Sequence, residues 1–308
     1  PNVLMIAEES TAWPLVTRPP EVGGLGFNLK WNMGWMNDMC HYLKLDPWFR
    51  QDHHRDITFS MMYAFSENYV LPISHDEVVH MKGSVVGKMP GDYENQLRCL
   101  RGFYAYLLAH PGKKLLFMGA ELGQWHEWDS DGQLDWYLLD QDINQKVHRF
   151  FKDINAFYKK EPALWEIDFS WEGFEWLVPD DNHNNVVVFL RKDKKGRDLL
   201  CAVNFSPNTY ENYRMGVPSH RRYVPVFNTD DPVYGGDGFG DAAAVAVEAI
   251  PSHGKEYSAA IRIPAFGAVF LRGEGTLPQP RKKKQAKEVQ SVKASVNEAN
   301  EAKELEKT

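Results

Sequence analysis

The sequence predicts an α/β fold in the first half of the chain and an all-β domain in the second half. Up to about residue 160, short apolar runs alternate with segments of helical period, as expected for a parallel sheet with right-handed crossovers. Beyond Pro162, short apolar runs follow one another with turn signals between them, which is typical of an antiparallel β-sandwich. About four strands are expected in the first half, which is half of a (β/α)8 TIM barrel.

Each element of the first half has its own signal. The apolar run 69–73 ends abruptly in polar residues, as a buried parallel strand does. Residues 33–43 place Met36, Met39 and Leu43 on one apolar face of a helix. Asp92 is expected to cap a helix that runs to His110. The other expected strands are 3–7, 25–32 and 113–118, and the other expected helices are 57–67 and 144–160.

The change of pattern places a domain boundary near residues 165–172. We expect the half barrel at 1–165, the all-β domain at 166–274 and a tail at 275–308. The tail is rich in Lys and Glu and poor in apolar residues, so it is expected to be disordered. The strands expected in the all-β domain are 174–177, 186–190, 199–205, 223–227, 257–263 and 268–271.

Composition excludes several classes of protein. The 308 residues carry a net charge of −7, and the basic residues are dispersed outside the tail, which argues against a nucleic-acid partner. No apolar run approaches the roughly 18 residues that span a membrane. Cys40, Cys99 and Cys201 are widely spaced and fit free thiols in the cytoplasm. No metal site is expected, and the polar segment 46–56 is expected to be a surface loop, including His53-His54.

The first residues predict that this sequence is a fragment of a longer protein. The first residue is Pro1, and a strand-like segment follows at once. A strand at 3–7 needs a neighbour that nothing before it supplies. A half barrel would also leave open sheet edges.

The chemistry-bearing residues follow two of the expected strands. His75, Asp76 and Glu77 come after the strand 69–73, and Glu8 and Glu9 come after the strand 3–7. Side chains just beyond the carboxyl ends of parallel strands form the active sites of α/β proteins. Paired carboxylates serve glycosidic bond chemistry, with one group protonated and another ionised. The alternative for Asp76 is a helix cap without a catalytic role.

Tryptophan is abundant, with 10 residues in the chain. Trp125 and Trp128 lie among polar residues, where indole rings can stack on sugar rings. An equally good interpretation is that these rings fix the conformation of a loop.

Several sequence blocks together carry a family resemblance. The chain resembles the C-terminal half of the 1,4-α-glucan (glycogen) branching enzymes of the α-amylase superfamily over about residues 1–272. The tetrapeptide SHDE (74–77) would be weak evidence alone, but five blocks in this order are specific. They are IAEEST (6–11), GGLGFNLKWNMGWMND (23–38), LPISHDEVVH (71–80), KMPGD (88–92) and KLLFMGAELGQWHEWD (114–129).

The resemblance implies the C-terminal half of a (β/α)8 TIM barrel followed by an all-β domain. It implies cleavage of an α-1,4 linkage and transfer of the chain to a 6-hydroxyl, as an α-1,6 branch, by a retaining double displacement without a cofactor. Matched by motif, Glu8 is the general acid/base and Asp76 stabilises the transition state, whereas Glu9 is the weaker candidate for the acid. His75 and Glu77 are assigned to substrate binding, together with the two tryptophans named above.

The chain departs from the family pattern at the nucleophile. The family places an Asp in a Gly-Phe-Arg-any-Asp-Ala pattern, and no such pattern occurs in this sequence. Arg55-Asp56 lies in a polar segment and does not replace it. Since retaining chemistry needs a nucleophilic carboxylate, we expect a partial sequence of an active enzyme, inactive as it stands.

Two alternatives stay open. A hydrolase of the same superfamily, acting on α-1,4 or trehalose-type linkages, would use Glu8 and Asp76 with water as the acceptor. A non-catalytic glucan-binding remnant would retain sugar stacking without turnover. The expected partner is an α-1,4-glucan such as glycogen, with no nucleic acid and no membrane, and a monomer is expected.

Overall fold

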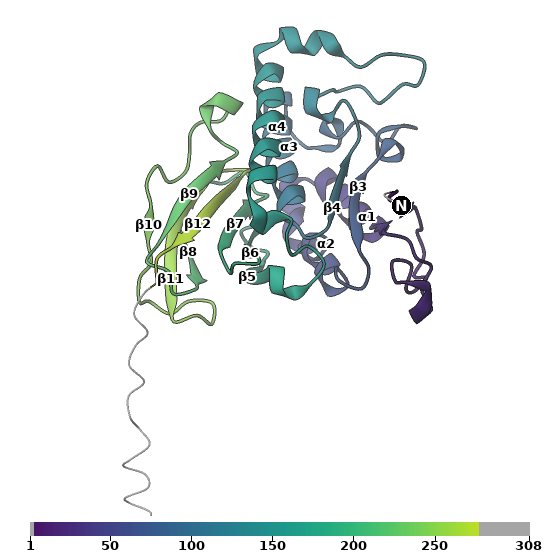
Figure 1. Cartoon of the computed structure of the whole chain (residues 1–308). Helices are drawn as coiled ribbons and strands as arrows, with labels where there is room; N and C mark the ends of the chain where they lie inside the picture. The colour runs from purple at the N-terminus through teal and green to yellow at the C-terminus, as the bar shows by residue number, and fades with distance from the viewer. Residues whose placement is uncertain (1–2, 277–308) are drawn as a thin grey trace, which may run out of the picture. The chain divides into compact units, whose positions relative to one another are not determined.

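The computed structural model describes residues 3–276 (Figure 1). The tail predicted to be disordered, 275–308, lies outside the described residues except for its first two positions. Within the described part, no helix has both the length and the apolar character needed to cross a bilayer.

The first half contains a parallel sheet with the strand order β1-β2-β3-β4. Helices α1 and α2 join β2 to β3, α3 joins β3 to β4, and α4 follows β4. The outer strands, β1 and β4, each have one open edge among the described residues. The bounds are β1 Ile6–Ala7, β2 Leu29–Trp31, β3 Tyr69–Ile73, β4 Lys113–Leu116, α1 Met33–Lys44, α2 Arg55–Thr58, α3 Tyr93–Ala109 and α4 Asp142–Lys160.

Two helices begin at the capping residues that their sequence supplies. The side chain of Asn32 accepts a hydrogen bond from the backbone N–H of Trp35 at the start of α1. The side chain of Asp92 accepts one from Asn95 at the start of α3, as the sequence predicted. Each cap satisfies a backbone donor that the helix itself leaves without a partner.

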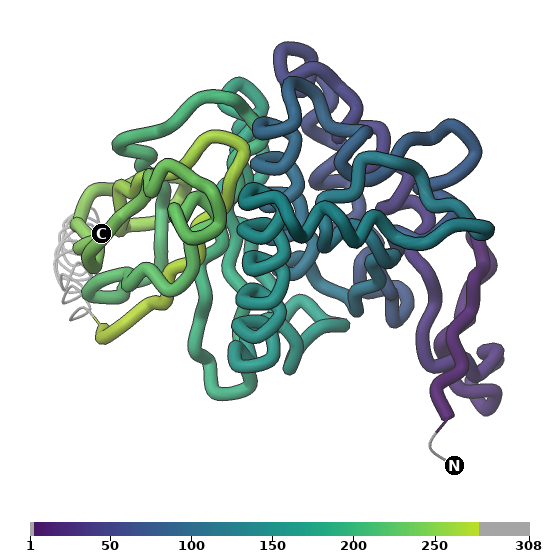
Figure 2. The backbone as a smooth tube through the Cα atoms, turned by 90° about the horizontal axis from the view of Figure 1, so that it is seen from above, coloured from purple at the N-terminus to yellow at the C-terminus, as the bar shows by residue number. Residues whose placement is uncertain are grey.

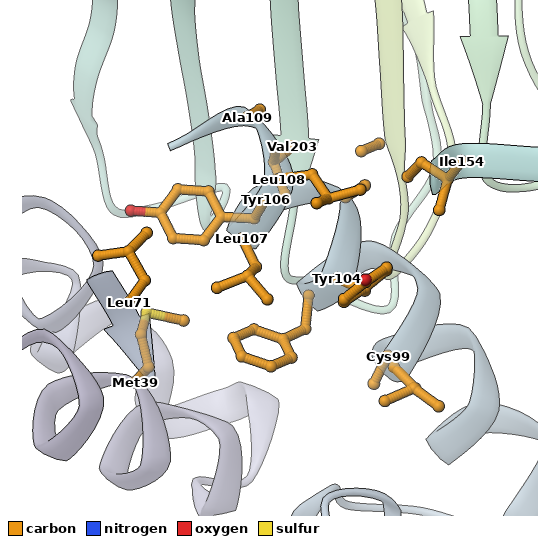
Figure 3. Close-up of a cluster of buried hydrophobic side chains, with 14 of the residues drawn as sticks. Met39, Leu71, Cys99, Tyr104, Tyr106, Leu107, Leu108, Ala109, Ile154 and Val203 are labelled. Atoms are coloured by element: carbon orange, nitrogen blue, oxygen red, sulfur yellow. The ribbon is translucent and has the colours of Figure 1, made fainter. Parts of the chain in front are cut away.

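Helix α3 forms the centre of the core. From Gln96 to Ala109 its side chains are almost all buried, except at position 98. A helix that is buried on every side needs neighbours on every side, and α3 has them in α1, β3, α4 and β7. Figure 3 shows this packing with Met39, Leu71, Tyr106, Leu107, Ile154 and Val203 among the labelled side chains.

The second half is all-β. A six-stranded sheet, β10-β9-β12-β7-β6-β5, packs against the pair β11-β8, with a second apolar cluster between them. In Figures 1 and 2, α3 and α4 lie between these strands, green to yellow, and the parallel sheet. The apolar core is continuous across the predicted boundary, whose position stays a prediction. The strands are β5 Phe174–Asp181, β6 Val186–Lys192, β7 Asp198–Asn204, β8 Tyr210–Val217, β9 Arg222–Asn228, β10 Val245–Ala246, β11 Tyr257–Ile263 and β12 Ala268–Glu274.

Three predictions in the first half were wrong in part. The strand expected at 3–7 is paired only at Ile6–Ala7, and residues 3–6 are exposed. The strand expected at 25–32 is reduced to Leu29–Trp31. The helix expected at 57–67 is replaced by the end of α2 and by a 3₁₀ helix, η3 (Phe59–Met62). In this short segment Phe59 and Met62 are exposed, so the expected apolar face is not the buried one.

The segment 46–56 is also more ordered than predicted. It forms a 3₁₀ helix, η2 (Pro47–His53), and the start of α2. Arg50 is buried and donates hydrogen bonds to the carbonyl oxygens of Leu43 and Phe205. His54 is buried beside the carbonyl oxygen of Pro179 at 3.0 Å, whereas His53 is partly exposed. The expectation of a surface site is therefore wrong for His54.

Candidate functional site

The carboxyl ends of β1 and β3 lie at the same edge of the parallel sheet, with β2 between them. Glu8 follows β1 directly, and Asp76 follows β3 in a short 3₁₀ helix, η4 (His75–Val78). Neighbouring strands are about 4.8 Å apart, so the two segments leave the sheet about 10 Å from each other. The structure thus brings Glu8 and Asp76 to one edge, and their catalytic roles stay predictions.

Glu8 and Glu9 lie in different surroundings. The side chain of Glu8 is exposed and makes no hydrogen bond or ion pair with any described residue. Glu9 is 2.6 Å from the Lys30 ammonium and accepts a hydrogen bond from the backbone of Thr11. The hydrogen bonds from Lys30 and Thr11 lower the pKa of Glu9 to about 2. A carboxylate held ionised in this way is a poor proton donor at neutral pH, which favours Glu8 as the acid.

His75 and Asp76 form a partly exposed pair. The Nε2 of His75 is 3.3 Å from the Oδ1 of Asp76, and about half of each side chain is accessible. The His75 ring contacts the rings of Phe117 and Trp128. Both polar groups therefore remain available to a ligand at the edge of the sheet, with the imidazole held by two aromatic neighbours.

The Glu77 side chain is buried and hydrogen-bonded to Ser74. Its carboxylate is buried and accepts hydrogen bonds from both the backbone N–H and the hydroxyl of Ser74, at 2.6 and 2.8 Å. Ser74 in turn caps η4, so the two residues form a capping box. These contacts argue against the predicted direct contact of Glu77 with a sugar. They indicate instead that Glu77 fixes the backbone that carries His75 and Asp76.

We expect Glu77→Ala to destabilise the protein by about 1 kcal/mol, because a backbone donor and a hydroxyl lose their buried acceptor. Urea unfolding would measure this change. A matched control is Glu94→Ala, since the Glu94 carboxylate is exposed and its one ion pair among residues 3–276 is with Arg98, and this change should cost much less. Equal losses for the two variants would contradict the capping role.

The loop 81–92 is held by two charged residues that the sequence analysis did not assign to the site, Glu127 and Lys88. The Glu127 carboxylate accepts hydrogen bonds from the backbone N–H groups of Met81 and Gly83, which lower its pKa. The Lys88 ammonium donates to the carbonyl oxygens of Glu77, Lys82 and Gly83. Burial lowers the pKa of Lys88 to about 8. The Glu127 contacts join residues 46 and 44 positions apart in sequence, so no local pattern reveals them.

The two predicted tryptophans differ in accessibility. Trp128 is wedged between the rings of Phe117 and His75, with centroid distances of 5.1 and 6.1 Å. This packing matches the alternative interpretation, in which the ring fixes a loop. Trp125 is 49% exposed and contacts Tyr93 at its edge. Trp125 is therefore the more accessible of the two for stacking on a sugar.

One group among the described residues has ligand atoms suited to a metal ion. Its ligand atoms, from His41, His53 and Asp56, lie within 4.8 Å of one another. The Nδ1 of His41 and the Oδ2 of Asp56 are 2.7 Å apart, which an ordinary hydrogen-bonded pair explains. The group lies on α1, η2 and α2, before β3 begins, and so at the opposite edge of the sheet from Asp76.

Comparisons with known proteins identify the relatives of the chain. The family described as "Alpha amylase, C-terminal all-beta domain" matches residues 176–274. A 1,4-alpha-glucan branching enzyme from Aquifex aeolicus is 51% identical over 276 residues, covering 89% of this chain and 44% of that protein. The enzyme of the same name from Halothermothrix orenii is 50% identical over 273 residues, covering 88% and 43%.

A solved structure supports the fold. The crystal structure of an alpha-amylase from H. orenii matches with a TM-score of 0.53 at 16% identity, covering 88% of this chain and 54% of that chain. At this identity the likeness concerns the fold alone. The chain spans less than half of the length of the branching enzymes described above. Over the portion that these comparisons cover, the chain is a homologue of the 1,4-alpha-glucan branching enzymes.

Proposed function

We propose that this chain carries part of the catalytic site of a glucan-branching enzyme. The observation that carries the proposal is about 50% identity to enzymes of that name over 88% of the chain. The common edge that holds Glu8 and Asp76 supports it. The reaction is the cleavage of an α-1,4-glucan chain and its transfer to a 6-hydroxyl, which forms an α-1,6 branch in glycogen.

In this proposal Glu8 protonates the leaving 4-oxygen and then removes the proton of the incoming 6-hydroxyl. Asp76 stabilises the positive charge that develops on the sugar in the transition state, and His75 donates a hydrogen bond to the same sugar. Retention of configuration requires a nucleophilic carboxylate about 5–5.5 Å from the acid. The sequence does not contain the family pattern for that residue.

We propose further that β1–β4 are half of a (β/α)8 barrel. Its remaining strands would pair with the open edges of β1 and β4 and would bring the nucleophile to Glu8. The exposed apolar side chains of Val3, Leu4 and Met5 next to β1 support this arrangement, because apolar strand residues are normally covered.

The surroundings of the cysteines support a location in the cytoplasm. Cys40, Cys99 and Cys201 are free. Burial raises the pKa of the Cys40 and Cys99 thiols to about 11, which keeps them protonated and unreactive. We also propose that the protein is a monomer that binds α-glucan rather than nucleic acid, as its net charge of −7 favours.

The test is an assay of the whole protein that contains this sequence, with amylose as the substrate. We expect a debranching enzyme to release short chains from the product, and we expect the 308-residue chain alone to give none. A rise in reducing ends without debranchable chains would show hydrolysis instead. Affinity for glycogen without any turnover of the whole protein would favour the glucan-binding remnant.

A further inference from the structure

The short helix η4, which carries Asp76, is held by donors from outside the helix. The carbonyl oxygen of Glu77, the next residue, accepts a hydrogen bond from the Lys88 ammonium. The carbonyl oxygen of Val78 accepts one from the backbone N–H of Trp128 at 3.0 Å. A helix of four residues has too few internal hydrogen bonds to fix its own position. The position of the Asp76 carboxylate therefore depends on these external contacts.

Lys88 is the buried member of this set of donors. Its side chain is almost fully enclosed, and a buried ammonium is costly unless its hydrogens find acceptors. The ammonium has three N–H groups, and its three acceptors are the carbonyl oxygens of Glu77, Lys82 and Gly83. One of these oxygens belongs to η4, and the other two belong to the loop 81–92. The ammonium thus joins the loop to the helix.

The start of the loop adopts a costly backbone conformation. His80 and Met81 have φ angles of 56° and 67°, in the left-handed region that side chains other than glycine disfavour. Such a conformation persists only where neighbouring groups enforce it. The Glu127 carboxylate accepts hydrogen bonds from the N–H groups of Met81 and Gly83, at 3.0 and 2.6 Å. The Lys88 ammonium holds carbonyl oxygens of the same turn, so two opposite charges enforce it from its donor and acceptor groups.

We propose that Lys88 is a positioning residue for the branching reaction, whose ammonium holds η4 so that the Asp76 carboxylate meets the sugar in the transition state. The inference rests on the proposed function, which gives Asp76 that role. Lys88 acts through the backbone of Glu77 and not by contact with the sugar. Small displacements of a group that stabilises the transition state cost large factors in rate, so this contact matters for the reaction as well as for the fold.

The proposal makes the protonated form of Lys88 the active one. A neutral amine donates two hydrogen bonds, so deprotonation leaves one of the three carbonyl oxygens without a donor. Burial lowers the pKa of Lys88 to about 8, and the charge of Lys44 on α1 acts in the same direction. The carboxylates of Glu77 and Glu127 oppose this shift. Cys40 of α1 also interacts with Lys88, but its thiol, with a pKa of about 11, is uncharged in this range.

The test measures kcat and KM for the branching of amylose by variants of the whole protein near neutral pH. We expect Lys88→Met to lower kcat about tenfold or more with little change in KM, because the lost contact acts in the transition state. Lys88→Arg keeps a charged donor and should recover part of kcat. Lys44→Met is the matched control, because it removes an exposed lysine of α1 and should leave kcat unchanged. Unchanged kcat in Lys88→Met, or an equal loss in Lys44→Met, would overturn the proposal.

The pH profile separates positioning from a general loss of stability. In the protein without these changes, kcat should decline as the pH rises through about 8. The residual activity of Lys88→Met should lack this decline, because the variant has no ammonium to deprotonate. A decline at the same pH in both proteins would assign it to another group, and the positioning role of the ammonium would then be wrong.

Amide hydrogen exchange gives a measurement that does not depend on branching. At a fixed pH, the amides of residues 75–83 should exchange about tenfold faster or more in Lys88→Met, and at an unchanged rate in Lys44→Met. Unchanged exchange in Lys88→Met would overturn the hold on η4. The proposed function fails separately, if the protein without these changes forms no debranchable chains from amylose. Faster exchange in Lys88→Met would still show, in that case, that the ammonium holds η4.

Discussion

Replacing Glu8 by Gln in the whole protein is expected to lower the rate of branching by about 10³-fold or more, because a positioned acid/base group contributes up to about 10⁴-fold. Glutamine keeps the size of the side chain and removes its exchangeable proton. The Glu8 side chain is exposed and makes no hydrogen bond or ion pair with a described residue, so the free energy of unfolding should not change. The rate is measured as debranchable chains formed from amylose, and the stability by urea unfolding.

Glu9→Gln is the matched control for this prediction. Glu9 is the adjacent carboxylate, and its contact with Lys30 holds it ionised. Its replacement should weaken the contact between β1 and β2 and lower the stability, with a much smaller effect on the rate. If Glu9→Gln abolished branching while Glu8→Gln retained it, the assignment of the acid would be wrong.

The sequence predicts β3, α1 and α3 well because the signals for these elements are local. The run 69–73 is apolar and β-forming, and the polar residues that follow cannot continue a buried strand. Asp92 caps α3 through its own side chain and a backbone donor three residues later. Patterns of this kind need no knowledge of distant contacts, so β3, α1 and α3 appear near their predicted positions.

Features that depend on distant contacts are not predictable from the sequence. The polarity of 46–56 predicts a surface loop, but Arg50 and His54 are buried. Their side chains can be buried because each has a backbone carbonyl oxygen as a hydrogen-bond partner, from Phe205 for Arg50 and from Pro179 for His54. Strand β8 exposes Glu211 and Asn212 near its start and buries Tyr213, Met215 and Val217 in the apolar cluster between the two sheets. The sequence predicts that Glu77 binds the substrate, and only its burial and its hydrogen bond with Ser74 in the structure indicate the capping role.

The second large effect is expected from the ion pair between Asp168 and Arg191. Both side chains are almost fully buried, and Arg191 Nη2 is 2.9 Å from Asp168 Oδ1. Arg191 also donates to the carbonyl oxygens of Ala109, Leu164 and Gly173, at the end of α3 and before β5. One guanidinium thus joins the helical layer to the all-β domain, and its charge is balanced chiefly by Asp168.

We expect Asp168→Ala to destabilise the protein by about 3–5 kcal/mol, because removing one partner leaves the other charge buried and unpaired. Urea unfolding measures this loss. Lys146→Ala is the control, since its pair with Asp142 is exposed and should contribute less than about 1 kcal/mol. The double variant Asp168→Ala/Arg191→Met should recover part of the stability, because the buried guanidinium that has lost its partner is removed as well. Additive losses in the double variant would contradict this explanation.

The contribution of Asp168 should also appear in the pH dependence of the free energy of unfolding. Burial alone would raise the pKa of Asp168, but the charges of Arg191, Lys114 and Lys113 outweigh it and lower the pKa below its usual value. A carboxyl whose pKa is lower in the folded state contributes stability above its unfolded pKa of about 4, and this contribution is lost as the pH falls through the folded pKa. Unfolding free energies measured from pH 7 downward should therefore decline below about pH 4. The decline should be smaller in Asp168→Ala, because this variant lacks the carboxyl group that takes up a proton on unfolding. An equal decline in both proteins would assign the effect to other carboxylates.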